Sequence, residues 1–319
     1  MSRILITSIS RKYALYKIVC EVAETLNADV FVTDKNDSCL GARFPGSHFL
    51  RQTVPEIDGI IQLVKDNSID LVIPSRDEEC RIFTSRIDEF KRNGCDLLAP
   101  RHCTVELCLN KEQFNGHLER LGLCPLPLLV DPEEDDFPIF MRPKSGAGSV
   151  GCMKIESRNH FEKIQLDKTE DYFIHPFIDD DEYSVDVITD AENDYFDCVI
   201  RKRVLVQNGE SQVTETADIP AIKNDIKTLI DSFRDVGHFV VQLFYSRDHG
   251  IRFIETNPRF GGASSLSQYA GLNSLKYLIY KKLGNKYYRK WTSAICSKPI
   301  RMTRLSHDHY EEVPHAPPN

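Results

Sequence analysis

The first hundred residues alternate short apolar runs with amphipathic helical segments, and this alternation limits the fold more than any other feature of the sequence. The apolar runs cover residues 4–9, 29–34, 70–74 and 96–100. Helical spacing of apolar side chains predicts one helix over residues 11–27 and another from about Asp77 to Lys91. Strands that alternate with helices form βαβ units and a parallel sheet. We therefore expect an N-terminal α/β unit that ends near residue 105.

Polar residues follow the predicted strands at their carboxyl ends, where open parallel sheets bind ligands. They are Ser8, Ser10, Arg11, Asp34 and the segment 75–79. Among them, Arg11, Asp77 and Glu78 are the candidates for holding an acceptor substrate. The alternative is that each of them only caps a helix or closes a turn.

The composition is that of a globular protein with one large domain or two, and it narrows the range of partners. Of the 319 residues, 41% are hydrophobic, and no apolar run approaches the roughly 20 residues of a membrane span. The formal net charge of -8 argues against nucleic acid as the main partner. The ten cysteines form no C-x-x-C pair, and the start MSRILITSISRKY has too short an apolar core for a signal peptide. We expect reduced thiols, a cytoplasmic location and no membrane partner, with a homodimer as one option for assembly.

Residues 240–259, VVQLFYSRDHGIRFIETNPR, predict a β-hairpin with a polar turn in the middle. A symmetric turn would place Gln242 opposite Glu255 and Phe244 opposite Phe253. Side chains alternate faces along a strand, so Glu255 and Asn257 share one face.

This hairpin would present one carboxylate and two amide oxygens on a single surface, from Gln242, Glu255 and Asn257. Oxygen ligands in that number suit Mg²⁺, which takes one or two carboxylates and completes its shell with phosphate and water. The alternative is a polar strand end at which Pro258 stops the ladder.

Three glycines, Gly146, Gly148 and Gly151, lie between two strand-like runs in FPIFMRPKSGAGSVGCMKI. A dinucleotide fingerprint needs a helix after its glycines, and a strand follows here instead. A glycine loop between strands is a flap whose backbone N–H groups can close over phosphates. Arg142 and Lys144 add positive charge beside it. A simple hairpin turn is the alternative.

Other segments predict the elements around these motifs. One helix is expected from Asn110, in capping-box spacing to Gln113, to Gly122, and another from Asn224 to Val236, closed by Gly237. Glu182 sits at a strand start, and Arg201 and Arg203 alternate onto one face of a later strand. A third helix follows the turn at Gly261 and Gly262, with Ser264 or a neighbour as its cap. We add Arg201, Arg203, Gly261 and Gly262 to the acceptor-binding candidates.

These elements, in this order, resemble the ATP-grasp superfamily and most of all the relatives of the carbamoyl phosphate synthase large subunit. The most specific parts of the resemblance are IRFIETNPRFGG and FPIFMRPKSGAGSVG. The resemblance implies a mixed α/β and α+β fold. A Rossmann-like pre-ATP-grasp domain with a parallel sheet would cover residues 1–105, and a two-lobed ATP-grasp domain would cover 106–292. Its glycine-loop lobe would span about 125–178 and its metal-binding lobe about 179–292, followed by a partly disordered extension at 293–319.

The resemblance also implies a role for each matching residue. ATP phosphates would be held by Lys111, Arg142, Lys144 and the loop containing Ser145, Gly146, Gly148, Ser149 and Gly151. Adenine would pair with the backbone of the linker containing His175, Phe177 and Ile178, and Glu182 would bind ribose. Gln242, Glu255 and Asn257 would hold Mg²⁺, with Mn²⁺ as an alternative. Arg259 would meet the γ-phosphate, so the catalytic group would be Arg142, Glu255, Asn257 and Arg259.

Two positions depart from the family pattern. Relatives usually have Glu or Gln where His175 stands, which leaves the selectivity for the base open. Many relatives have a carboxylate where Gln242 stands. A neutral amide at that position should weaken metal binding in the absence of nucleotide.

The implied activity is ATP-dependent ligation in two steps. A carboxylate attacks the γ-phosphate of MgATP to give an acyl phosphate, and an amine then displaces phosphate. The alternatives are a stand-alone relative of carbamoyl phosphate synthase, a small-molecule kinase that stops after phosphoryl transfer, and a nucleotide-binding module without catalysis. The residues name neither the carboxylate nor the amine.

Overall fold

The N-terminal part of the chain forms the predicted parallel sheet. In a computed structural model, which describes residues 1–52, 56–144, 150–164, 171–291 and 293–305, this sheet has five strands in the order β3-β2-β1-β4-β5. The strands are β1 (Arg3–Ile6), β2 (Asp29–Val32), β3 (His48–Phe49), β4 (Leu71–Ile73) and β5 (Asp96–Leu97), and every pair is parallel. The order reverses between β1 and β4, so the switch point of the sheet lies there.

Helices α1 (Tyr13–Leu26), α2 (Glu56–Asn67), α3 (Asp77–Ser85) and α4 (Ile87–Arg92) connect these strands. The single helix predicted from Asp77 to Lys91 is wrong, because the backbone leaves the helical region at Arg86. The Arg86 side chain there binds Asp58 and Glu89, which fixes the break. Two helices follow β5: α5 (His102–Leu109), which the sequence did not predict, and α6 (Lys111–Arg120). Asn110 caps α6 by accepting from the Gln113 N–H, as expected.

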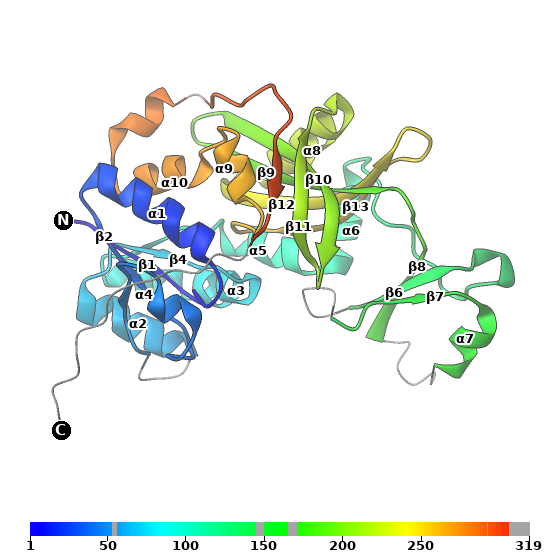
Figure 1. Cartoon of the computed structure of the whole chain (residues 1–319), viewed down its shortest axis with the longest axis horizontal. Coiled ribbons are helices and arrows are strands. Elements are labelled where there is room, and N and C mark those ends of the chain that lie inside the picture. The colour runs from blue at the N-terminus through cyan, green and yellow to red at the C-terminus, as the bar shows by residue number, and fades with distance from the viewer. Residues whose placement is uncertain (53–55, 145–149, 165–170, 292, 306–319) are drawn as a thin grey trace.

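A six-stranded sheet fills the middle of the molecule, in the order β13-β12-β9-β10-β11-β14 (Figure 1). Its strands are β9 (Asp181–Asp190), β10 (Tyr195–Gln207), β11 (Glu210–Ala217), β12 (Val236–Ser246), β13 (Gly250–Asn257) and β14 (Arg301–Thr303). Strand β14 pairs with β11, so part of the predicted C-terminal extension belongs to this sheet. Residues 306–319 lie outside the described part.

The β12–β13 hairpin forms as predicted, and Gln242 lies opposite Glu255. The predicted pairing of Phe244 with Phe253 is wrong, since Leu243 faces Phe253 and Phe244 faces Arg252. The register shifts between Gln242 and Leu243, which leaves Ile254 as an extra residue on β13. Such a bulge frees a backbone carbonyl from the ladder.

Helix α8 (Pro220–Phe233) begins four residues before the predicted helix over 224–236 and ends three residues before it. Pro220 occupies the first helical turn, where a missing N–H costs nothing, and Arg234 ends the helix in a left-handed conformation. Gly237 is therefore no helix cap. It lies in β12, where a Cβ atom would come within 2.9 Å of Pro100 Cγ.

A three-stranded antiparallel sheet forms the end of the molecule opposite the N-terminal sheet (Figure 1). It contains β6 (Ile139–Pro143), β7 (Met153–Ile155) and β8 (Tyr172–Pro176), with α7 (Arg158–Lys163) on the connection between β7 and β8. The predicted strands on both sides of the glycine loop are thus confirmed. The loop residues 145–149 lie outside the described part.

Helix α9 (Ser265–Tyr269) is followed by α10 (Ser274–Lys282), and the core of the N-terminal sheet continues into α10. One buried cluster joins Ile4 and Val19 with Leu275, Tyr277 and Leu278. The division of the chain at residue 105 therefore stays a prediction, because the two parts share a core. No helix in the described ranges is long and apolar enough to cross a membrane.

We expect Gly271→Ala to lower the free energy of unfolding by roughly 3 kcal/mol. Gly271 has a φ of +103°, and a Cβ atom would lie 2.3 Å from the backbone oxygen of Ala294. Gly250→Ala is the matched control: its φ is +71° and nothing lies within 4 Å of the added atom. It should cost only about 1 kcal/mol. Urea unfolding of the two variants measures the difference, and equal losses would contradict the packing argument.

Candidate active site

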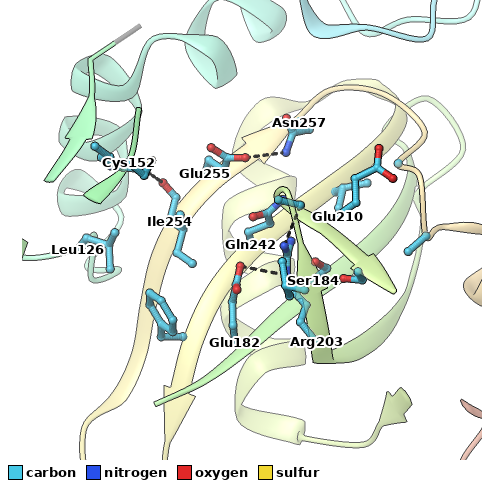
Figure 2. Close-up of a pocket in the computed structure, with 18 of the residues that line it drawn as sticks. Leu126, Cys152, Glu182, Ser184, Arg203, Glu210, Gln242, Ile254, Glu255 and Asn257 are labelled. Atoms are coloured by element: carbon cyan, nitrogen blue, oxygen red, sulfur yellow. Dashed lines mark hydrogen bonds and ion pairs between the residues drawn. The ribbon is translucent and has the colours of Figure 1, made fainter. Parts of the chain in front are cut away.

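A single cavity of about 430 Å³ collects residues from the six-stranded sheet, the three-stranded sheet and helices α3 and α6. Figure 2 shows side chains from β9, β12 and β13 pointing into it, with Leu126 and Cys152 on the side of the three-stranded sheet. The cavity thus lies between the six-stranded sheet and the three-stranded sheet.

The register of the sheet arranges the polar side chains of the cavity floor in rows. Arg201 pairs with Ser184, Ser184 with Gln242, and Gln242 with Glu255, so one row crosses β10, β9, β12 and β13. All four side chains line the cavity. The neighbouring row contains Asp186, Val240 and Asn257. Positions that share a row are neighbours on one face of a sheet, which brings distant parts of the sequence together.

Three oxygen-bearing side chains of the cavity could act as metal ligands: Glu255, Asn257 and Gln242. The Asn257 amide donates to Glu255 Oε1 at 3.2 Å, and Gln242 lies directly opposite Glu255 (Figure 2). One carboxylate and two amide oxygens on one face are a donor set that fits a hard cation such as Mg²⁺. The described residues contain no group of three His, Cys, Asp or Glu side chains that could hold a metal. A metal bound here would therefore need the two amide oxygens and oxygen atoms of a ligand as well as the carboxylate.

Cationic side chains lie next to these oxygen-bearing side chains, on the side of β13. Arg142, on β6, donates from Nη1 to the carbonyl of the bulged residue Ile254 at 3.1 Å, and its Nη2 is buried without a partner in the described structure. Burial lowers the pKa of Arg142, yet the ordinary value is so high that the group stays charged. Lys111, at the start of α6, also lines the cavity. Burial and the charge of Arg142 lower its pKa.

Arg259 follows the donors on the chain and also lines the cavity. It donates from Nη2 to Asp77 Oδ2 at 2.6 Å. Burial alone would lower the pKa of Arg259, but the adjacent Asp77 carboxylate outweighs it and raises that pKa. The pair fixes the guanidinium beside Asn257.

Comparisons with known proteins support the same fold. The sequence model of a family described as "ATP-grasp in the biosynthetic pathway with Ter operon" matches residues 168–306. The biotin carboxylase domain of Hydrogenobacter thermophilus 2-oxoglutarate carboxylase, solved with MgADP, ADP and bicarbonate, has a TM-score of 0.71 at 12% identity over 89% of this chain and 70% of that one. N5-carboxyaminoimidazole ribonucleotide synthetase from Thermotoga maritima has a TM-score of 0.65 at 16% identity, with 89% and 76% covered. The L-amino acid ligase of Bacillus licheniformis has a TM-score of 0.66 at 17% identity, with 89% and 74% covered.

The chain has the ATP-grasp fold. A comparison with curated protein sequences finds no match. The expected fold class is confirmed, and the family model supports the expected superfamily over residues 168–306, while the roles of individual residues stay predictions.

The predicted adenine linker of the ATP-grasp fold lines the cavity through His175, Phe177 and Ile178. The His175 side chain is not free to contact a base. Its Nε2 accepts from Arg142 Nε at 3.0 Å, and its Nδ1 lies 2.6 Å from the carbonyl of Pro127. Because Nε2 accepts, Nδ1 carries the proton and donates to Pro127. His175 thus positions Arg142, and the predicted contact with adenine would have to come from the rest of the linker.

We expect His175 to make stability depend on pH. Burial, with help from the charge of Arg142, lowers the pKa of His175 to about 4. Below the ordinary value of about 6.5 the unfolded chain takes up a proton that the folded chain refuses, so stability falls. Between pH 6.5 and 5 the loss should be about 2 kcal/mol. His175→Gln removes this term, and urea unfolding at the two pH values should show a smaller loss. The same loss in both proteins would contradict this assignment.

Glu182, the predicted ribose ligand, lines the cavity one row away from Gln242. Burial raises its pKa, and Arg203 opposes that rise from 3.2 Å (Figure 2). Of the glycine-loop candidates, Gly151 is described and has a φ of +79°. Ser145, Gly146, Gly148 and Ser149 lie outside the described residues. Lys144 is exposed and is not among the residues that line the cavity.

The acceptor-binding candidates divide into two groups. Arg201, Arg203, Gly261, Gly262 and Asp77 line the cavity. Arg11 and Glu78 are exposed and are not among its lining residues. The cation that turns inward from the β1 loop is Lys12, which donates to the side chain and carbonyl of Ser75. Burial and the nearby charge of Arg259 lower its pKa to about 8.

Three buried or half-buried residues at the site were not singled out from the sequence. Cys152 lines the cavity next to Arg142, Lys12 lies at the switch point, and Asp186 lies under the glycine turn. Glu182, Ser184 and Asp186 follow one another at intervals of two residues along β9. They therefore share one face of the sheet, and applying this period to Glu182 would have pointed to Asp186. Nothing in the sequence separates Lys12 from Arg11.

Proposed function

We propose that this protein is an ATP-dependent ligase that activates a small-molecule carboxylate as an acyl phosphate for attack by an amine, releasing ADP. The observation that carries the proposal is the meeting of two groups in one cavity. The oxygen donors Glu255, Asn257 and Gln242 lie next to Arg142, Lys111 and Arg259. This combination holds a polyphosphate and neutralises charge as a phosphoryl group transfers.

Each group has a separate task in this mechanism. Arg142 and Lys111 would hold the phosphates, and Arg259 would stabilise the charge that develops on the transferred group. Glu255, Asn257 and Gln242 would hold Mg²⁺, which would offset the negative charge of the phosphates when bound. The backbone of residues 175–178 would hold adenine and Glu182 the ribose. No side-chain nucleophile is required, because the substrate carboxylate attacks phosphorus itself.

Assembly and location stay predictions. The ten cysteines are all free thiols, which agrees with a reducing compartment such as the cytoplasm. A small-molecule carboxylate and an amine are the proposed partners, and neither nucleic acid nor a membrane is expected.

A screen for ADP release tests the proposal. Carboxylates and amines are offered with MgATP, singly and in pairs. Release that requires both partners supports a ligase and identifies its substrates. Release with a carboxylate alone supports a small-molecule kinase or an uncoupled acyl phosphate. If ATP raises the melting temperature and no pair releases ADP, a nucleotide-binding module is the better explanation.

A further inference from the structure

A buried carboxylate, Asp186, lies under the floor of the cavity and organises the groups around it. It is fully buried on β9. Its oxygens accept from Ser264 Oγ, from Ser267 Oγ at 2.5 Å and from Arg201 Nε at 2.5 Å. His238 Nε2 lies 3.3 Å away. Burial by itself would raise the pKa of Asp186, but Arg201 and His238 outweigh it, so the carboxylate stays ionised.

Asp186 also fixes the glycine turn that follows the metal donors. Ser264, which donates to Asp186, accepts from the N–H of Gly261 at 2.9 Å. A Cβ atom on Gly261 would come within 2.8 Å of Ser264 Oγ, so the turn approaches that hydroxyl as closely as only glycine allows. Ser264, which was expected with its neighbours as the cap of α9, occupies the N-cap position, but its hydroxyl is used in this network and makes no cap bond.

Arg201, like His238, has a side-chain nitrogen in this network that makes no hydrogen bond in the described structure. It is 2% exposed, it lines the cavity, and its Nη1 is buried without a partner in the described structure. The neighbouring arginines are tied to other acidic side chains, although Arg203 Nε, like Arg201 Nη1, makes no hydrogen bond in the described structure. Arg203 pairs with Glu182 and donates to the Gly209 carbonyl, and Arg304 pairs with Glu210 and donates to the Gly262 carbonyl. A buried charged donor without a partner is costly unless a ligand satisfies it.

The register places this donor away from the proposed phosphate site. Arg201 and Gln242 are two strands apart in the same row, which is about 10 Å between backbones. Glu255 is one strand further on. Arg142 reaches the cavity from beyond β13, through its bond to Ile254. An anion on Arg201 would therefore lie on the opposite side of the metal donors from phosphates held by Arg142.

We propose that Arg201 Nη1 binds the carboxylate substrate, and that Asp186 is the positioning residue that fixes this subsite together with the glycine turn. The proposal rests on the proposed function and assigns the end of the cavity at which its carboxylate substrate sits. Guanidinium groups pair strongly with carboxylates, and an arginine already oriented by a buried acid loses little freedom on binding.

Calorimetric titration of the full chain with sodium malonate, at constant ionic strength and with and without MgADP, tests the subsite. We expect saturable binding by the wild type and at least about tenfold weaker binding by Arg201→Gln. Lys202→Gln is the matched control, because Lys202 is the next residue on β10, pairs with Asp181 and is not among the residues that line the cavity. It should bind malonate like the wild type. MgADP affinity should be the same in all three proteins.

Asp186→Asn tests the positioning role and should weaken malonate binding about fivefold or more while leaving MgADP affinity unchanged. If that variant does not fold, Ser267→Ala removes one donor to Asp186 and should weaken malonate binding about twofold or more. If Asp186 only stabilises the fold, these variants would have a lower melting temperature and an unchanged affinity for malonate.

Three results would overturn the subsite: no malonate binding to the wild type, equal binding to Arg201→Gln, or binding of inorganic phosphate in place of malonate. If MgADP binds and malonate does not, the subsite fails and the proposed ligase stands. If MgADP does not bind, the proposed function fails, and the titration without nucleotide still decides on Arg201.

Discussion

Replacing Glu255 with Gln should reduce ADP release by at least about 10²–10³-fold, because loss of one preorganised electrostatic group typically costs that much. The change removes the only carboxylate of the proposed metal set while keeping its size and the acceptor for the Asn257 amide. The fold should therefore stay intact. Steady-state ADP release with the substrates found in the screen, and circular dichroism for folding, measure the two quantities.

A second glutamate in the same sheet provides the control. Glu215 on β11 pairs with Arg301 and does not line the cavity. Glu215→Gln should release ADP at the wild-type rate. A Glu255→Gln variant that keeps a tenth of wild-type activity would remove Glu255 from the metal set. Raising the Mg²⁺ concentration should partly restore activity if metal affinity is what is lost, since mass action then refills the site.

Replacing Arg142 with Met should reduce ADP release by about 100-fold or more while changing the free energy of unfolding by less than about 2 kcal/mol. Arg142 is 6% exposed, and one of its nitrogens has no partner in the described structure, so its charge is expensive to bury. Met fills a similar volume without that cost. The variant also loses the hydrogen bonds to Ile254 and His175, and this loss offsets the gain from removing the buried charge. We therefore expect little change in the free energy of unfolding.

The His175→Gln variant is the control for Arg142. Gln can still accept from Arg142 Nε, so the guanidinium should stay in place and ADP release should fall less than about tenfold. Wild-type activity in Arg142→Met would show that Arg142 does not hold the phosphates. A large loss of stability would show that it acts as a structural group instead.

The outline of the site could be predicted from the sequence because the decisive residues are close together in the chain. Glu255 and Asn257 are two residues apart on one strand, so the period of two alone places them on one face. Gln242 and Glu255 are joined by a short hairpin, so a symmetric turn brings them opposite each other. The prediction failed beyond that point, at Phe244, because an extra residue on β13 shifts the register and sequence spacing does not report a bulge.

The parallel N-terminal sheet, the hairpin that carries Gln242, Glu255 and Asn257, and the strands around the glycine loop could be predicted from the sequence, because local periodicity and turn residues specify each of them. Three features required the folded chain: the buried Asp186 lies beneath the cavity and binds Arg201, Lys12 rather than Arg11 turns inward, and β14 completes the central sheet. The physical reason is that these positions depend on pairing between strands far apart in the sequence. Strand order and register, and the burial that follows from them, arise only when the whole sheet has formed.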